Sequence, residues 1–270
     1  MAIVTTDNKH YTDIADAIRN KGVSGSFTPA QMSAAIGQIE ISGGEDPMSG
    51  SFTLPAPITR VAGLFRGTTL PETFTLNLPN TCTYIGTETA GSEYQLFRGV
   101  LGMKHLQING SALTYDDGAI TNNSVIEDVT YNDGTTEITL ADSSPFLRCG
   151  ALKSINAVLV CAGISSGNNA FAWTDNIENI RFKSNLMTFL RLERWRPDKL
   201  TNASIISLCN ALKQGKAATA TFTATLKNKL STIYGTVDSN ESFPVFIETG
   251  VTSDITLADF VTNTRGWTVA

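Results

Sequence analysis

Residues 97–106 read Phe-Arg-Gly-Val-Leu-Gly-Met-Lys-His-Leu, and the spacing of their large apolar residues recurs along the chain. The shared frame is a large apolar residue, five residues, an aliphatic residue or Met, two residues, and another aliphatic residue. Its four copies are Phe97, Met103 and Leu106; Ile120, Ile126 and Val129; Phe146, Leu152 and Ile155; and Phe171, Ile177 and Ile180. The copies begin 23, 26 and 25 residues apart, a period typical of a solenoid of stacked units.

A single repeat is too small to fold alone. Ordering about 25 residues costs roughly 1–2 kcal/mol of backbone entropy per residue, whereas each fully buried anchor returns only about 1.5–3 kcal/mol. We therefore expect stability from the interfaces between repeats and from closed ends. Residues 64–67, Leu-Phe-Arg-Gly, recur unchanged at 96–99, but counting forward from Phe65 meets Pro71 and Phe74. This upstream copy is interpreted as degenerate, or as a cap.

The composition limits the partners. Of the 270 residues 41% are hydrophobic, which supports a sizeable core, and the net charge of −5 argues against nucleic acid or an anionic membrane as the main partner. No stretch approaches the length of a membrane-spanning segment, and residues 1–10 lack a charged or hydrophobic leader. We expect synthesis in the cytoplasm without export by the usual route.

The four cysteines are far apart, with no C-x-x-C pair and no nearby histidines, so neither a zinc site nor another cofactor is expected. Four cysteines are enough for two disulfides. Each cysteine lies among apolar or small residues, however, which favours reduced and buried thiols. The four are Cys82, Cys149, Cys161 and Cys209.

The sequence predicts an α+β protein in four regions. Residues 1–41 are expected to form a helical hairpin that acts as a docking module, because Thr28-Pro29-Ala30-Gln31 gives a helix start and apolar residues follow at helical spacing. The expected docking residues are Ile14, Ile18, Met32, Ile36 and Ile39. Residues 42–50 have the composition of a flexible linker.

The remaining two regions are a repeat domain over 51–200 and a capping region over 201–270. A helix is predicted to begin at Thr201 or Asn202 and to end near Gly215, and a second helix is predicted over 224–233. The apolar face of the first comprises Ile205, Leu208, Cys209 and Leu212. Strands are expected at 243–247 and 266–269, where the chain would close the end of the solenoid.

Several of these stretches resemble known families. Residues 11–19 and 27–32 resemble the N-terminal module of many virion and tail-associated proteins of phages and prophages. The F-x5-L-x2-I repeats resemble the leucine-rich repeats of bacterial surface adhesins, although Ile120 replaces the aromatic residue and the frame is missing after Phe171. Residues 203–212 and 266–270 resemble the usual ending of phage repeat proteins. The resemblance implies a leucine-rich-repeat-like solenoid with an α/β cap.

The resemblance further implies a structural virion protein of a bacteriophage, in the tail, baseplate or tail fibre, and no catalytic residues. We expect it to dock onto other tail proteins, to form a homo-oligomer in the virion and to present its repeats to a host-surface polysaccharide or protein. One alternative is a capsid or neck decoration or connector without host contact. A second is a tail-associated polysaccharide hydrolase, because glycoside hydrolysis needs only two carboxylates.

The candidate surface-binding residues are Trp173, Arg191, Arg194 and Trp195. Tryptophan with arginine is a composition typical of binding hot spots, while core packing is the alternative for each tryptophan. His10 and His105 are expected to be solvated. The turns at 116–118 and 132–134 are expected to serve backbone geometry and not Ca²⁺. We therefore expect a binding protein and not an enzyme.

Overall fold

The computed structural model describes residues 50–61, 63–85, 96–111, 113–115, 120–140, 145–165, 170–240 and 242–270. The predicted helical hairpin over 1–41 lies outside these residues, as do its docking residues, His10, the turn at 116–118 and most of the linker at 42–50. Those expectations stay predictions. The fold below is that of the described residues.

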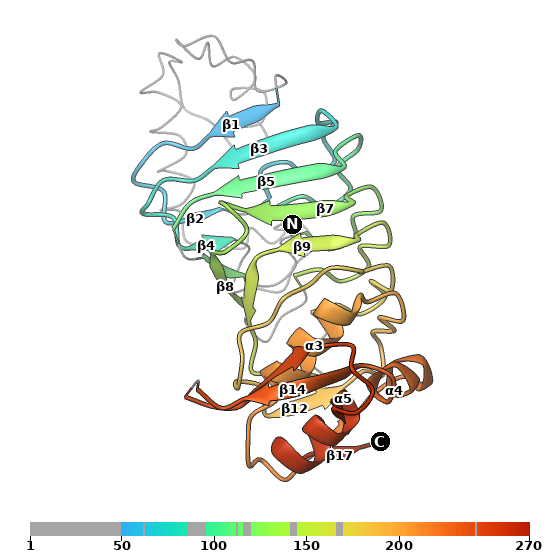
Figure 1. Ribbon diagram of the computed structural model, residues 1–270. Coiled ribbons are helices and arrows are strands. Elements are labelled where there is room, and N and C mark those ends of the chain that lie inside the picture. Colours follow the sequence, from blue (N-terminus) through green and yellow to red (C-terminus); the bar gives the residue numbers. More distant parts are fainter. Residues whose placement is uncertain are drawn as a thin grey trace, which may run out of the picture.

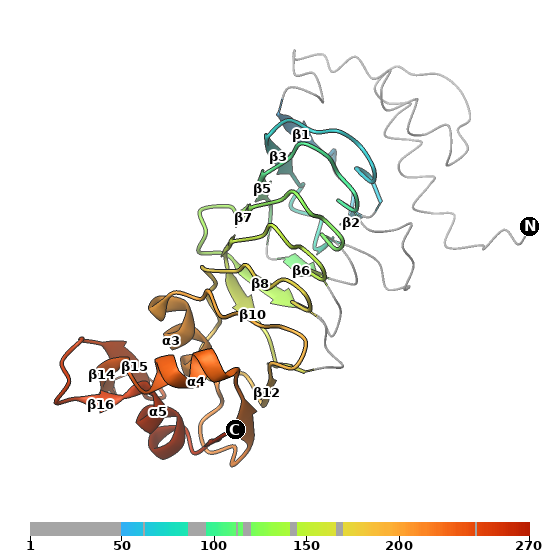
Figure 2. The same cartoon turned by 90° about the vertical axis from the view of Figure 1, so that its right-hand side faces the viewer.

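Two parallel sheets are built from strands that alternate along the chain. The first has the order β1 (Ser51–Thr53), β3 (Thr73–Asn77), β5 (His105–Asn109), β7 (Asp128–Tyr131) and β9 (Ser154–Asn156). The second contains β2 (Arg60–Val61), β4 (Tyr84–Ile85), β6 (Leu113–Tyr115), β8 (Glu137–Leu140) and β10 (Val158–Val160). Each successive turn of the chain therefore adds one strand to each sheet, and the turns lie stacked along one axis (Figures 1 and 2).

The strands form because buried apolar residues alternate with polar ones. In β5, Leu106 and Ile108 are buried, whereas the alternating residues His105, Gln107 and Asn109 are half-buried, as the period of two requires. Pairing aligns Leu106 with Val129 and Val129 with Ile155. All twelve residues of the four frame copies are at most 5% exposed. The prediction that the frame points into the core is confirmed.

The upstream copy is a full turn of the stack. The ring of Phe65 is stacked on that of Phe97 with centroids 5.4 Å apart, and Phe74 pairs with Leu106. Both pairs, Phe65 with Phe97 and Phe74 with Leu106, are 32 residues apart in the sequence. Because β1 pairs with β3 one layer further out, this copy is not the end of the stack.

The frame also continues after Phe171. The indole ring of Trp195 lies 4.7 Å from the ring of Phe171, and its Nε1 donates a hydrogen bond to the carbonyl oxygen of Thr174 at 3.1 Å. A tryptophan thus takes the place that phenylalanine has in the preceding turns. The sequence frame missed this turn because it requires an aliphatic residue six positions after the aromatic one. Six residues after Trp195 the chain has Thr201, where a helix begins.

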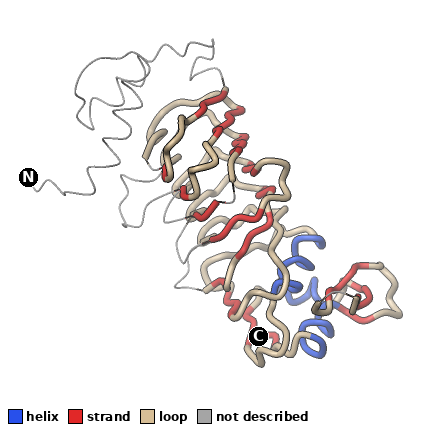
Figure 3. The backbone as a smooth tube through the Cα atoms, turned by 90° about the vertical axis from the view of Figure 1, so that its left-hand side faces the viewer, coloured by secondary structure: helices blue, strands red, loops and turns tan. Residues whose placement is uncertain are grey.

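The remaining elements gather at the C-terminal end of the stack (Figures 1 and 3). A third, parallel sheet has the order β11 (Gly163–Ile164), β12 (Phe189–Arg191), β13 (Thr219–Thr221) and β17 (Thr268–Val269). An antiparallel sheet has the order β15 (Val245–Glu248), β14 (Tyr234–Asp238) and β16 (Ile255–Thr256). The helices are α3 (Asn202–Ala211), α4 (Ala224–Leu230) and α5 (Leu257–Asp259), which leads into a π-helical turn η2 (Phe260–Thr264).

Both predicted C-terminal helices are present, but each is shorter than predicted, since α3 ends at Ala211 and α4 at Leu230. Thr201 is the N-cap of α3, with its side chain accepting a hydrogen bond from the Ser204 backbone, and Thr223 caps α4. The apolar face predicted for α3 is buried. The third sheet crosses residue 200, since β12 pairs with β13, and a single core cluster runs from Leu54 to Trp267. The expected repeat and capping regions thus share one core.

Candidate functional site

The outward face of the first sheet is a continuous polar surface. Every side chain that alternates with a buried residue on β3, β5, β7 and β9 is polar, and parallel pairing arranges these side chains in rows across the strands. They are Thr73, Thr75, Asn77, His105, Gln107, Asn109, Asp128, Thr130, Ser154 and Asn156. We call these ten residues the polar face.

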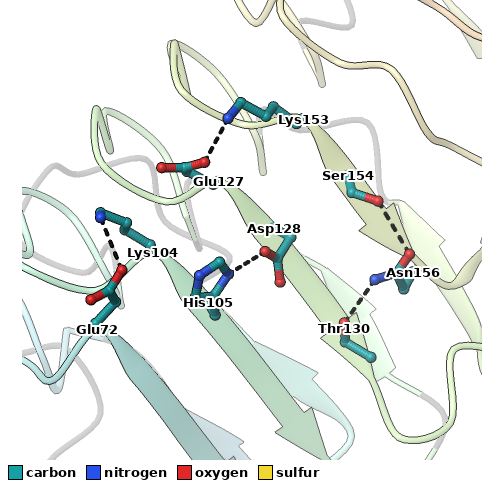
Figure 4. A network of polar contacts seen from close by, with 9 residues as sticks. All are labelled: Glu72, Lys104, His105, Glu127, Asp128, Thr130, Lys153, Ser154 and Asn156. Atoms are coloured by element: carbon teal, nitrogen blue, oxygen red, sulfur yellow. Dashed lines mark hydrogen bonds and ion pairs between the residues drawn. The ribbon is translucent and has the colours of Figure 1, made fainter.

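Amide side chains connect the polar face internally. The Asn109 Nδ2 donates to Asn77 Oδ1 at 2.8 Å, and Gln107 Nε2 donates to Asn109 Oδ1 at 2.8 Å and to the Asn132 carbonyl at 2.7 Å. Further along, Asn156 Nδ2 donates to Thr130 Oγ1 at 2.9 Å (Figure 4). Side chains held by one another lose less freedom on binding a ligand. The polar face is therefore preorganised.

A column of alternating charges borders this face at the strand starts. Lys104 Nζ lies 2.9 Å from Glu72 Oε1, and Lys153 Nζ lies 2.6 Å from Glu127 Oε2 (Figure 4). Hydrogen bonding to Lys104 lowers the pKa of Glu72, and hydrogen bonding to Lys153 lowers that of Glu127. Both pairs are exposed, so each adds little stability. Their alternation leaves the border without a net charge of one sign.

His105 has a partner that the sequence did not reveal. It is half-exposed, as expected, but its Nδ1 contacts Asp128 Oδ2 on the next strand, and Thr73 pairs with His105 from the other side. Within the described residues no hydrogen bond joins Thr73 to His105. A signal did exist, because His105 and Asp128 each directly precede the last residue of their frame copy.

The turn at 132–134 serves backbone geometry, as predicted. Asn132 has a positive φ of 48°, and its side chain exchanges two hydrogen bonds of 2.9 Å with the backbone of Gly110. Asp133 accepts hydrogen bonds from Thr135, which lower its pKa. Among the residues that the structure describes, no group of three His, Cys, Asp or Glu side chains is placed to hold a metal ion.

A cleft of about 720 Å³ opens where the polar face meets α3. Its strand side carries Asn156 of β9 with Asn179 and Arg181 of the following turn. Its helix side carries Thr201, Ala203 and Ile206. The sequence did not predict this cleft, because it depends on how α3 packs after the last turn of the stack.

The prediction that two tryptophans and two arginines form a surface-binding group is wrong for Trp195. That residue is 2% exposed because it continues the aromatic column of the core. Trp173 is 48% exposed, and the guanidinium carbons of Arg148 and Arg194 lie 5.0 and 5.8 Å from its ring centroid. Arg191 is exposed and lines a small crevice together with Arg194.

Arg148 belongs to this surface group although the sequence did not indicate it. The signal was its place in the frame, two residues after Phe146, where Trp173 stands two residues after Phe171. That position has a left-handed φ between 55° and 67° in the five turns that begin at Phe65, Phe97, Ile120, Phe146 and Phe171. Its occupants are Gly67, Gly99, Asn122, Arg148 and Trp173. We call Arg148, Trp173 and Arg194 the Trp173 cluster.

Comparisons with known proteins identify no relatives: no family model matches the chain, and no curated protein or solved structure matches it significantly. None of the helices in the described part of the chain has the length and apolar composition needed to cross a bilayer. Function must therefore be inferred from the surfaces above and from the resemblances of the sequence.

Proposed function

We propose that this chain is a structural virion protein of a bacteriophage, a component of the tail, baseplate or tail fibre that presents a stacked surface for binding. Its stack is classed in this proposal as a leucine-rich-repeat-like solenoid with an α/β cap. The observation that carries the binding role is the polar face, whose side chains are fixed by hydrogen bonds across neighbouring turns. Extended surfaces of this kind are how repeat proteins bind their partners.

The assignment to a virion rests on the N-terminal sequence. Residues 11–19 and 27–32 resemble the docking module of tail-associated proteins. In this proposal the residues 1–41 attach the chain to other tail proteins, and the stack projects from that attachment as one of several copies. A partner bound by the stack is then a component of the host surface or another protein of the virion.

Particle incorporation tests the docking role. Phage particles are assembled with either the full chain or a chain that lacks residues 1–41, and both are quantified in purified particles by mass spectrometry. We expect the shortened chain to be made at normal levels but to be absent from the particles. Incorporation at the normal copy number would contradict docking through this region.

Binding to host cells tests the recognition role. We expect the full chain to bind envelope material of a susceptible strain and not that of a resistant strain. Incorporation into particles without binding to any susceptible strain would favour a connector without host contact. Release of sugar fragments from purified envelope would instead favour the hydrolase.

A further inference from the structure

The cleft beside α3 carries polar side chains on both walls and an apolar patch on its helix side. On the strand side, Asn156 and Asn179 present amide groups. Asn156 already donates to Thr130 and accepts from Ser154, and Asn179 accepts from Thr201, but an amide has two N–H donors and two acceptor lone pairs, so each keeps capacity for a ligand.

On the helix side, Ala203 and the largely buried Ile206 form an apolar patch beside the polar side chains of Thr201, Ser207 and Asn210. A ligand that fills this cleft therefore needs hydrogen-bonding groups toward both walls and one apolar face that fits against Ala203 and Ile206.

The backbone around the cleft is closed to a peptide strand. The amide nitrogen of Ile180 donates to Ser204 Oγ at 3.0 Å, and that of Phe182 donates to Ser207 Oγ at 2.8 Å. Addition of a strand requires unpaired backbone groups at a sheet edge. Since α3 already occupies these groups, side chains must provide most of the contacts to a ligand.

The charges in the cleft balance. Asp133 and Arg181 both line it, and the guanidinium group of Arg181 also donates to the Gly134 carbonyl oxygen. One carboxylate and one guanidinium give no net charge to attract an ion. The cleft is thus suited to an uncharged ligand.

We propose that this cleft binds a neutral sugar unit, with its hydroxyl groups on Asn156 and Asn179 and the apolar face of its ring on Ala203 and Ile206. The Asn156 side chain also belongs to the polar face, where it donates to Thr130. Further units of an oligosaccharide would therefore extend from the cleft onto the polar face. This inference deepens the proposed function and rests on it where the sugar is taken to belong to a host envelope.

The test uses the full chain on three arrays: neutral oligosaccharides of hexose, N-acetylhexosamine and deoxyhexose units, oligosaccharides that contain uronic or sialic acids, and peptides. The variant Ala203→Trp fills the cleft from an exposed helix position. Thr139→Trp is the matched control, because it adds the same ring at an exposed position on β8. Asn179→Ala removes a hydrogen-bonding group without adding bulk.

We expect the full chain to bind neutral oligosaccharides, and Ala203→Trp and Asn179→Ala to weaken this binding by about tenfold or more. Thr139→Trp should bind as the unchanged chain does. Unfolding midpoints of all three variants verify that each is folded. Equal binding by Ala203→Trp and Thr139→Trp would overturn the location of the site. Binding of acidic sugars alone would overturn the ligand class. Binding of peptides that is lost in the Ala203→Trp variant would overturn it as well.

Failure of the two proposals can be told apart. If the chain is present in particles and binds host cells but no neutral oligosaccharide, the cleft proposal is overturned and the proposed function stands. If the chain is absent from particles but binds neutral oligosaccharides in a manner that Ala203→Trp abolishes, the virion assignment fails and the sugar site stands.

Discussion

The side-chain oxygen of Ser204 on α3 accepts a hydrogen bond from the backbone nitrogen of Ile180 at 3.0 Å. In the preceding turn, the backbone nitrogen of Ile155 donates instead to the carbonyl oxygen of Asn179. Ser207, one helical turn after Ser204, accepts from Phe182 in the same way. Two hydroxyls spaced three residues apart on one helix face thus replace the acceptors of a further strand and satisfy the amides of Ile180 and Phe182 at this edge of the stack.

Removal of the first of these hydroxyls should destabilise the protein. Ser204→Ala leaves the Ile180 amide without its acceptor, and a buried donor left unsatisfied costs about 1–3 kcal/mol. We expect a loss of this size in the free energy of unfolding, measured by urea denaturation. Ser253→Ala, at an exposed position, is the control and should change stability by less than about 0.5 kcal/mol. Equal stability of the two variants would mean that α3 does not close the sheet in this way.

Adjacent residues of one repeat should differ sharply in their effect. Leu152 is fully buried in the frame row, whereas Lys153 is exposed and pairs with Glu127. Leu152→Ala should cost about 2–5 kcal/mol, because apolar burial is lost and a cavity is left. Lys153→Ala removes one exposed ion pair and should cost less than about 0.5 kcal/mol.

Thermal or urea unfolding of the full chain measures both variants under the same conditions. A comparable loss in the two would mean that the frame is not an inward row, and the stacked arrangement of these residues would have to be abandoned. Because each anchor is shared between neighbouring turns, the transition of Leu152→Ala should shift as a whole.

The apolar frame could be predicted from the sequence because it is local. Residues at fixed distances within one turn, such as Phe146 and Leu152, reveal the inward row directly. The polar face could not be predicted as a site, since it depends on contacts between turns. His105 pairs with Asp128, which lies 23 residues later in the chain, and with Thr73, which lies 32 residues earlier. Because the loops between these strands differ in length, the sequence does not show that the three residues lie in one row.

Trp195 shows the opposite difficulty. The nearby Arg191 and Arg194 gave it the composition of a binding surface, while its distance of 24 residues from Phe171 placed it in the aromatic column. Periodicity proved the better guide, because stacking constrains each position of a turn more strongly than the residues beside it. The same argument identifies Arg148, whose equivalence to Trp173 follows from the frame alone.

The cysteines should be unreactive in the folded protein. All four are free and buried, as predicted, and burial raises the pKa of Cys82 to about 11 and that of Cys149 to about 12. The thiolate is the reactive form, so its population near neutral pH is very small. We expect a thiol-specific reagent to modify all four in denaturant and none in the native state. Rapid native modification of Cys149 would contradict its burial in the stack.

The backbone at Trp173 gives a test that is independent of ligand binding. With a φ of 56°, this residue adopts a left-handed conformation that costs an L-residue roughly 1–2 kcal/mol and costs glycine almost nothing. Trp173→Gly and Trp173→Ala both remove the indole ring and its contacts with Arg148 and Arg194. The two variants therefore differ mainly in backbone strain.

We expect Trp173→Gly to be more stable than Trp173→Ala by about 1 kcal/mol in urea denaturation, the reverse of the usual preference for alanine. Ala172→Gly, at the neighbouring buried position where no positive φ occurs, is the control and should destabilise the chain. If Trp173→Ala is the more stable variant, the left-handed turn is not retained in solution. If Trp173→Gly is the more stable one, the chain carries a strained, half-exposed tryptophan where Gly67 and Gly99 stand in other turns, and the Trp173 cluster becomes the next surface to examine for binding.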